Sequence, residues 1–194
     1  MKKTITYLIL LITVVAGTSF VPSYNEPKTE TSNKNPIDTF PVPVGFKKMI
    51  FYVQRTLNTN TIIYELNYDA DSTLNKTEPV NCHWIRYDEK GEVTELSYFQ
   101  KKYAYGLNAV LIDATKLIYK LNFVSYKKRD IFLSKAATGH SYKAYMVING
   151  KLSYIEKIFV QIDGGTFWLP HISFVEIKGY DIATGKPVLE RIIP

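Results

Sequence analysis

The chain has 194 residues, of which 46% are hydrophobic, 22% are charged and 14% are aromatic, and its formal net charge at pH 7 is +6. This length suffices for a hydrophobic core without covalent crosslinks, and a single cysteine excludes an intramolecular disulfide. The positive charge is small and scattered over short lysine clusters, which argues against a nucleic-acid partner.

The first 19 residues have the pattern of a secretory signal peptide. Lys2 and Lys3 precede an apolar run from Ile5 to Ala16, and small residues follow where cleavage would occur. The run is too short for a comfortable membrane span, although an uncleaved anchor is the alternative. We therefore expect a periplasmic or secreted protein with no membrane span in the mature chain.

The rest of the chain divides into a tether and one domain. Residues 20–40 are rich in Pro, Thr, Asn and charge, have no periodic apolar pattern, and predict a flexible tether. Residues 41–194 contain no repeat and no second linker. They predict a single β-rich domain.

Strand patterns dominate the first part of this domain. In KKMIFYVQR, Met49, Phe51 and Val53 occupy alternate positions and share one face. A turn at 58–60 leads into the second run, TIIYELNY, in which alternate residues from Ile62 to Tyr68 share a face. After a polar loop, VNCHWIRY gives a third run that ends at the turn DEKG.

One helix is predicted next, in TELSYFQKKYAYG, with Thr94 as its cap and Gly106 at its end. LNAVLI, KLIYKLNFVSY and RDIFLSK follow as strands, and Asn149-Gly150 predicts a tight hairpin turn. Two further runs close the chain. The fold class predicted is mainly β, an antiparallel barrel or sandwich of about eight to nine strands with one short helix.

Cys82 and His83 are adjacent, which raises the possibility of a catalytic pair. Neighbouring strand residues point to opposite faces, so we expect Cys82 to be buried in phase with Trp84 and inert. A catalytic thiol would need a distant base such as His140 or His171. The histidines have no metal-ligand spacing, and the chain lacks the usual catalytic motifs. The sequence therefore predicts no catalytic residue, no metal and no cofactor.

Two arginines continue apolar strand faces. Arg55 follows Met49, Phe51 and Val53 at alternate positions, and Arg86 is likewise in phase with Cys82. A cation at the margin of an apolar interior needs a carboxylate or an anionic ligand group. Solvent exposure, or pairing with Glu65, Asp88 or Glu95, is the alternative. With an aromatic wall added, the predicted ligand-binding residues are Arg55, Tyr64, Trp84 and Arg86.

These residues favour an exported, non-enzymatic domain that binds a small amphipathic or anionic ligand. A second group of aromatic residues offers a different function, recognition of a cell-envelope glycan or of another protein, unless the rings are core residues. A hydrolase with a convergent site is the third alternative, and the oligomeric state stays open. The second aromatic group comprises Tyr98, Phe99, Tyr103, Tyr105, Phe167 and Trp168.

Three stretches also carry a resemblance. FYVQRTLNTNTIIYELN, PVNCHWIRY and ELSYFQKKYAYGLNA, together with the closing GYDIATGKPVLERIIP, resemble a functionally uncharacterised family of small exported bacterial domains. The resemblance extends over roughly residues 46–194. It implies one domain and export from a bacterium, and it assigns no catalytic residue.

Overall fold

The computed structural model describes residues 40–56, 58–136, 141–166 and 169–194. All of the described residues belong to one compact unit. The predicted signal peptide and all but the last residue of the predicted tether lie outside the described residues, as do His140, Phe167 and Trp168.

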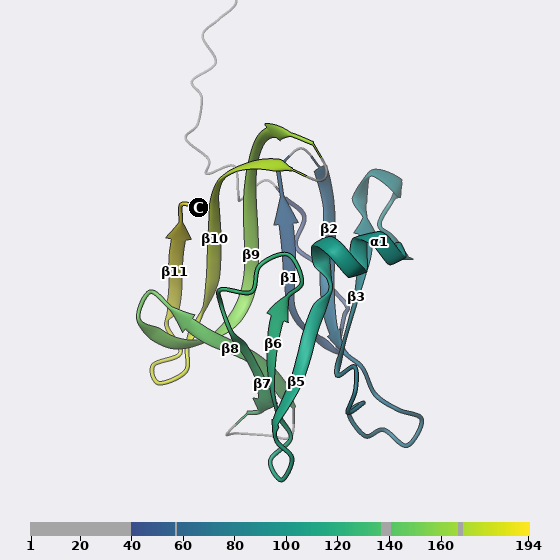
Figure 1. Ribbon diagram of the computed structural model, residues 1–194, viewed down its shortest axis with the longest axis vertical. Coiled ribbons are helices and arrows are strands. Elements are labelled where there is room, and N and C mark those ends of the chain that lie inside the picture. The colour runs from purple at the N-terminus through teal and green to yellow at the C-terminus, as the bar shows by residue number, and fades with distance from the viewer. Residues whose placement is uncertain (1–39, 57, 137–140, 167–168) are drawn as a thin grey trace, which may run out of the picture. The chain divides into compact units, whose positions relative to one another are not determined.

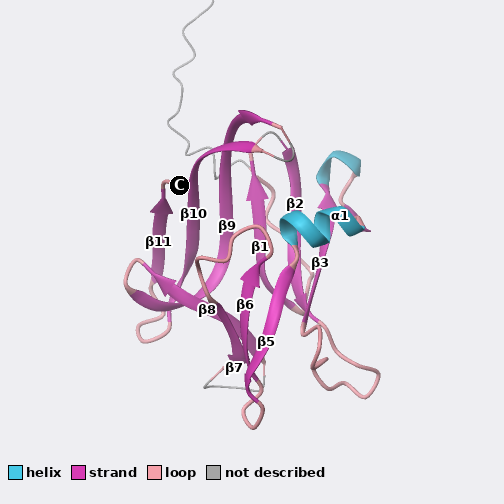
Figure 2. Cartoon of the chain, in the orientation of Figure 1, coloured by secondary structure: helices cyan, strands magenta, loops and turns pink. Residues whose placement is uncertain are grey.

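The described part of the domain is built from eleven strands and three short helical turns (Figures 1 and 2). The strands are β1 (Met49–Arg55), β2 (Asn58–Leu66), β3 (Val80–Arg86), β4 (Glu92–Glu95), β5 (Leu107–Asp113), β6 (Ile118–Phe123), β7 (Ile131–Lys135), β8 (Tyr142–Ile148), β9 (Lys151–Gly165), β10 (Pro170–Asp181) and β11 (Pro187–Ile192). The turns are the 3₁₀ turn η2 (Tyr87–Glu89), the single α-helical turn α1 (Tyr98–Gln100) and the π-helical turn η3 (Lys101–Tyr105).

Nine strands follow one another in a strongly curled sheet that forms a half-barrel, in the order β4-β3-β2-β1-β9-β8-β7-β6-β5. The long β9 makes this curl possible because it changes partner along one edge. Its first four residues pair with β8, and residues 157–160 then pair in parallel with β1. The other edge pairs with β10 from Ser153 to Gly165, and β10 pairs in turn with β11. A register shift in the β9–β10 ladder lies where β9 changes partner.

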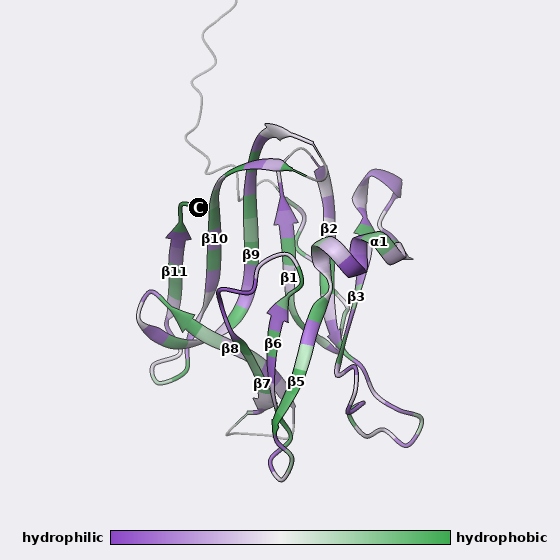
Figure 3. Cartoon of the chain, viewed as in Figure 1, coloured by the Kyte–Doolittle hydropathy of each residue, from purple (hydrophilic) through white to green (hydrophobic). Residues whose placement is uncertain are grey.

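The hydrophobic core lies inside the curl and draws on β1 to β3 and on β6 to β10. Alternation along the strands places every second side chain there, and Figure 3 shows hydrophobic and hydrophilic positions interleaved along most strands. A small second cluster, Tyr52, Ile63 and Ile85, covers the opposite face of β1 to β3.

The mainly β fold, its nine-stranded curled sheet and its one short helix confirm the predicted fold class. The strands β1 and β9 pair in parallel, which makes the sheet mixed. The strand β4 was not predicted. Met49 also differs from expectation: a β-bulge between Met49 and Phe51 turns Met49 to the outer cluster, so it does not share the face of Phe51.

The helix begins later than predicted. Thr94 belongs to β4, and Ser97 is the cap, in a reciprocal pair of hydrogen bonds with Gln100. The helix ends as predicted at Gly106, whose N–H donates to the Lys101 carbonyl over 3.0 Å. A Cβ at position 106 would lie 2.1 Å from that oxygen, so this π-helical ending requires glycine.

Candidate functional site

Two of the predicted site residues, Arg55 and Trp84, meet at the end of β1. The guanidinium carbon of Arg55 lies 5.5 Å from the Trp84 ring centroid and 6.0 Å from that of Tyr105. The two rings meet edge to face, with centroids 5.4 Å apart, and the Trp84 indole N–H points to Gln100 Oε1 at 3.4 Å. Arg55 is therefore held against two aromatic side chains, an arrangement that favours a cation.

Tyr64 lies in the hydrophobic core next to this cluster and stabilises it. Its side chain is fully buried and its ring stacks on Phe51, with centroids 4.5 Å apart. Its hydroxyl donates a 2.7 Å hydrogen bond to the Tyr105 carbonyl. Tyr64 thus fixes the backbone that carries Tyr105, and full burial leaves it no surface for a ligand.

The structure does not bring Arg86 to the cluster. Its guanidinium pairs with Glu89 at 2.5 Å, three residues along the chain, and both side chains are more than a third exposed. Exposed pairs of this kind contribute little to stability. Arg86 takes the ion-pair alternative, although its partner is none of the three carboxylates considered from the sequence.

Cys82 and His83 lie on opposite faces of β3, as predicted. Cys82 is buried in the core, and desolvation raises the pKa of its thiol to about 11. His83 Nε2 lies 3.3 Å from Glu65 Oε2, with the imidazole beside Phe46. A mostly protonated thiol that is turned away from the neighbouring imidazole cannot pass its proton to it, so this pair is not a nucleophile and its base.

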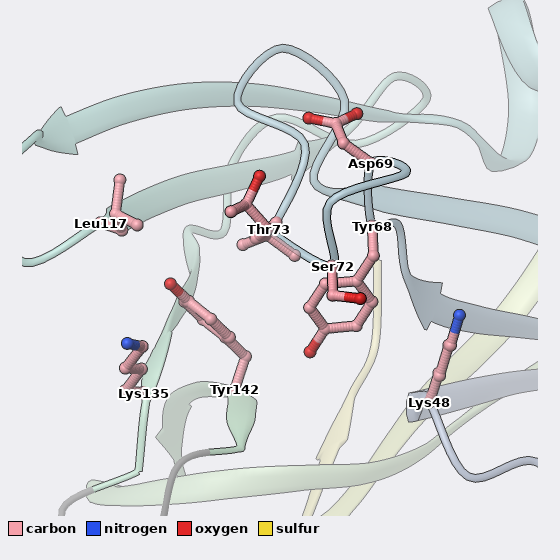
Figure 4. Close-up of a pocket in the computed structure, with 9 residues that line it drawn as sticks. Lys48, Tyr68, Asp69, Ser72, Thr73, Leu117, Lys135 and Tyr142 are labelled. Carbon is pink, nitrogen blue, oxygen red and sulfur yellow. The ribbon is translucent and has the colours of Figure 1, made fainter.

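A hollow of about 650 Å³ lies at the end of β1 opposite to Arg55, and we call it the Tyr68–Tyr142 pocket (Figure 4). The ammonium of Lys48 lies 5.4 Å from the Tyr68 ring centroid, and that of Lys135 lies 5.8 Å from the Tyr142 centroid. The pocket is lined by Lys48, Tyr68, Asp69, Ser72, Thr73, Leu74, Leu117, Lys135 and Tyr142.

The charges around this pocket are unbalanced. Neither Lys48 nor Lys135 forms an ion pair within the described ranges. The Asp69 carboxylate accepts a hydrogen bond from Asn75 Nδ2 at 2.7 Å, which engages it within its own loop. Burial first, and then the neighbouring hydroxyls of Tyr119 and Tyr68, raise the pKa of Tyr142. The pocket therefore combines two exposed lysine ammoniums with one carboxylate, and its formal charge is positive.

A smaller hollow of about 280 Å³ opens between β3 and β5. Its apolar floor includes Val80, Cys82 and Leu121, and its rim includes Lys101 and Lys102. Both lysines already have partners, because Lys101 pairs with Glu95 at 2.6 Å and Lys102 donates to the Tyr98 hydroxyl at 3.0 Å. This hollow is less suited to an anion than the larger pocket.

The surface beside this hollow carries three exposed aromatic side chains. Tyr98, Phe99 and Tyr103 are 67%, 59% and 50% exposed. Their rings are contiguous, with centroids 5.7 Å apart for Tyr98 and Phe99 and 6.2 Å apart for Phe99 and Tyr103. The Lys102 ammonium lies over the Tyr98 and Tyr103 rings. We call these three residues the α1 aromatic patch.

The Tyr68–Tyr142 pocket was not predicted. Its members come from the beginning of β1, the loop after β2, the β5–β6 turn and the β7–β8 region, so no local motif marks them. The only signal was the position of Tyr68, which is in phase with Tyr64 along the second run and was expected to share its face. Tyr105 was considered only as an aromatic residue, because nothing in the sequence places a helix end beside Arg55.

No cluster of three metal-ligating side chains occurs in the part of the chain that the structure describes. Within the same residues, no helix combines the length and the apolar character that crossing a bilayer requires. His171 lies on β10. Hydrogen bonds from Gln161 and Ser173 are the main causes of a lowered pKa at Asp163, and the electrostatic interaction with His171 makes a smaller contribution in the same direction.

A family model described as "Domain of unknown function (DUF4833)" matches residues 51–191. No curated protein and no solved structure matches the chain.

Proposed function

The chain belongs to the family described as Domain of unknown function (DUF4833), and we propose that this member is an exported, non-enzymatic domain that binds a small amphipathic anion in the Tyr68–Tyr142 pocket. The proposal depends on one observation. Two lysine ammoniums, each over the ring of a tyrosine, face a hollow of about 650 Å³ without an ion-pair partner among the described residues.

The size and composition of the pocket support this choice of ligand. Small-molecule sites are concave, have volumes of roughly 300–1,000 Å³, and combine apolar walls with a few polar groups. Tyr68, Tyr142 and Leu117 supply ring and aliphatic surface for an apolar body. Lys48 and Lys135 supply charge for carboxylate, sulfonate or phosphate groups. A neutral ligand would make no use of the two exposed ammoniums.

The test uses 8-anilinonaphthalene-1-sulfonate, which joins an aromatic body to an anionic sulfonate, as the probe. We expect saturable fluorescence enhancement with the wild-type protein. In the double variant Lys48→Gln/Lys135→Gln we expect the probe's affinity to fall at least about tenfold, which corresponds to about 1.4 kcal/mol. Equal affinity in the wild type and the double variant would refute the pocket as the site.

A matched control separates a local effect from a loss of net charge. Lys143 is exposed on β8 and follows Tyr142, so its side chain points to the other face of the strand. The Lys143→Gln variant should bind the probe with unchanged affinity. Native mass spectrometry of gently purified protein, compared with the denatured sample, should then reveal any bound host ligand by its extra mass.

The exposed rings favour a second candidate function, recognition of a cell-envelope glycan through the α1 aromatic patch. Aromatic faces stack on apolar faces of sugar rings, and contiguous exposed aromatic residues mark interaction sites. The double variant Tyr98→Ala/Phe99→Ala should lose binding to purified envelope polysaccharide and keep its unfolding free energy. Unchanged binding to the polysaccharide would remove this candidate and leave the pocket proposal intact.

A further inference from the structure

The arginines of the chain divide into two kinds. Arg86 pairs with Glu89, Arg129 with Glu190, and Arg191 with Glu176. Arg55 forms no ion pair with any carboxylate in residues 40–56, 58–136, 141–166 and 169–194. It is therefore the exception among arginines that otherwise each have a carboxylate partner.

Aromatic contact does not explain this exception. The guanidinium of Arg191 also lies over a ring, 4.2 Å from the Phe174 centroid, and still bonds Glu176 through Nη2 at 2.9 Å. A ring face attracts a cation but accepts no in-plane hydrogen bond, so the N–H groups at the guanidinium edge still need acceptors. Arg191 has such an acceptor, and among the described residues Arg55 has none.

The local environment makes the missing acceptor costly. Arg55 is only partly exposed, and its Nε is buried without a hydrogen-bond partner in the described residues. The rings of Trp84 and Tyr105 beside the guanidinium lower the local dielectric constant. A low dielectric constant raises the free-energy cost of an unpaired charge. The same environment strengthens a hydrogen bond to an arriving anion.

We propose that Arg55 is an anion-binding residue that receives a single oxyanion group, a carboxylate or a phosphate, of a ligand or partner, with Trp84 and Tyr105 contacting the atoms next to that group. The site lies at the opposite end of β1 from the Tyr68–Tyr142 pocket, because Lys48 precedes this strand and Arg55 ends it. It is a second site, independent of the proposed function of the pocket.

The geometry around Arg55 is fixed by residues that the ligand does not touch. The Tyr64 hydroxyl holds the Tyr105 carbonyl at 2.7 Å, and Gln100 accepts from the Trp84 indole while it caps the helix. The guanidinium therefore meets rings held in place by the fold. A preorganised site loses less entropy on binding.

The test follows the arginine side chains directly in wild-type protein by ¹H–¹⁵N spectra of the Nε–H groups. Sodium acetate and sodium phosphate are titrated separately, with sodium chloride at equal ionic strength as the reference. We expect the Arg55 signal to shift saturably with acetate, phosphate or both, with half-saturation at a concentration at least about tenfold below any response of the three paired arginines. The more effective anion identifies carboxylate or phosphate as the preferred group.

Two results would overturn the proposal. One is an Arg55 signal that moves no more than those of Arg86, Arg129 and Arg191. The other is a response to chloride equal to the response to acetate and phosphate. We also expect anion binding beside Trp84 to change the tryptophan fluorescence of the wild-type protein. This change should disappear in the Arg55→Gln variant and persist in the Arg86→Gln variant. The test by ¹H–¹⁵N spectra does not depend on the folding of either variant, because those spectra are recorded on wild-type protein.

Discussion

The Arg129 guanidinium and the Glu190 carboxylate form a two-fold ion pair across 61 residues of chain, with Nη1 donating to Oε2 at 3.0 Å and Nη2 donating to Oε1. Glu190 Oε2 also accepts the Asn149 backbone N–H at 2.8 Å. One carboxylate on β11 thus joins the segment before β7 and the β8–β9 turn.

Replacing Glu190 should reveal the strength of this junction. Glu190→Gln keeps a carbonyl oxygen for Asn149 but loses the charge that pairs with Arg129, so we expect the free energy of unfolding to fall by about 1–3 kcal/mol. Urea denaturation at pH 7 measures it. Glu89→Gln, which removes the exposed partner of Arg86, is the control and should cost below about 1 kcal/mol. Equal effects would show that Glu190 is an ordinary surface residue.

The same pair should make stability depend on pH. Hydrogen bonds from Arg129 lower the pKa of Glu190 in the folded state from its ordinary value of 4.5. A lowered pKa means that the stabilisation is complete above 4.5 and is lost as the pH falls through the folded-state pKa. The stability difference between wild type and Glu190→Gln should therefore shrink on acidification below pH 4.5. A difference that stays constant down to acid pH would contradict this origin.

Two buried tyrosine hydroxyls should respond oppositely to removal. Tyr64→Phe leaves the Tyr105 carbonyl without its donor and should cost about 1–2 kcal/mol. Tyr119→Phe removes a hydroxyl that has no partner among the described residues, and should be neutral or stabilising. Thermal unfolding of the two variants gives the comparison, in which each serves as the other's control. A Tyr119→Phe variant as unstable as Tyr64→Phe would show that this hydroxyl is bonded in solution.

Cys82 should be almost unreactive in the folded protein. With its thiol pKa raised to about 11, about one thiol in a thousand is ionised at pH 8, and the side chain is only 8% exposed. Labelling with a thiol-specific disulfide reagent should be slow in the native protein and rapid in urea. Equally fast labelling in both states would revive the hypothesis of a catalytic thiol.

Gly179 should tolerate no side chain. A Cβ there would lie 2.1 Å from the Tyr154 carbonyl oxygen on β9, so Gly179→Ala must displace backbone in the β9–β10 pair. We expect a loss of about 2–3 kcal/mol. Gly185→Ala has open space around its Cβ but a φ of +68°, and should cost about 1 kcal/mol. Equilibrium unfolding of both variants should preserve this order; a reversed order would mean that β10 adjusts freely.

The strands with alternating apolar residues were predictable because alternation directly encodes which face is buried. The strand β4, EVTE, has no such pattern, since it is exposed and is defined only by pairing with β3. The displaced position of Met49 also follows from a bulge, which changes the phase without changing composition. The parallel β1–β9 pair lies beyond any local pattern because its partners are distant in the chain.

The candidate sites show the same division. The phases of Arg55 and Trp84 on their strands sufficed to predict that they face one interior, and the structure places them 5.5 Å apart, guanidinium carbon to ring centroid. The contact with Tyr105 required the position of a helix end, which sequence does not supply. Arg86 is at the end of β3 and can reach Glu89 in the following turn, so its phase alone did not determine its partner.

The change of partner along β9 has a consequence for how the domain folds. Residues 52–55 on β1 pair with residues 157–160, which lie far along the chain, whereas the β8–β9 and β9–β10 hairpins join strands that are adjacent in sequence. Loop closure over so many residues is entropically costly and slow. We therefore expect the hairpins to form early and the β1–β9 seam to close late. The slow step of folding would then be the meeting of two preformed halves.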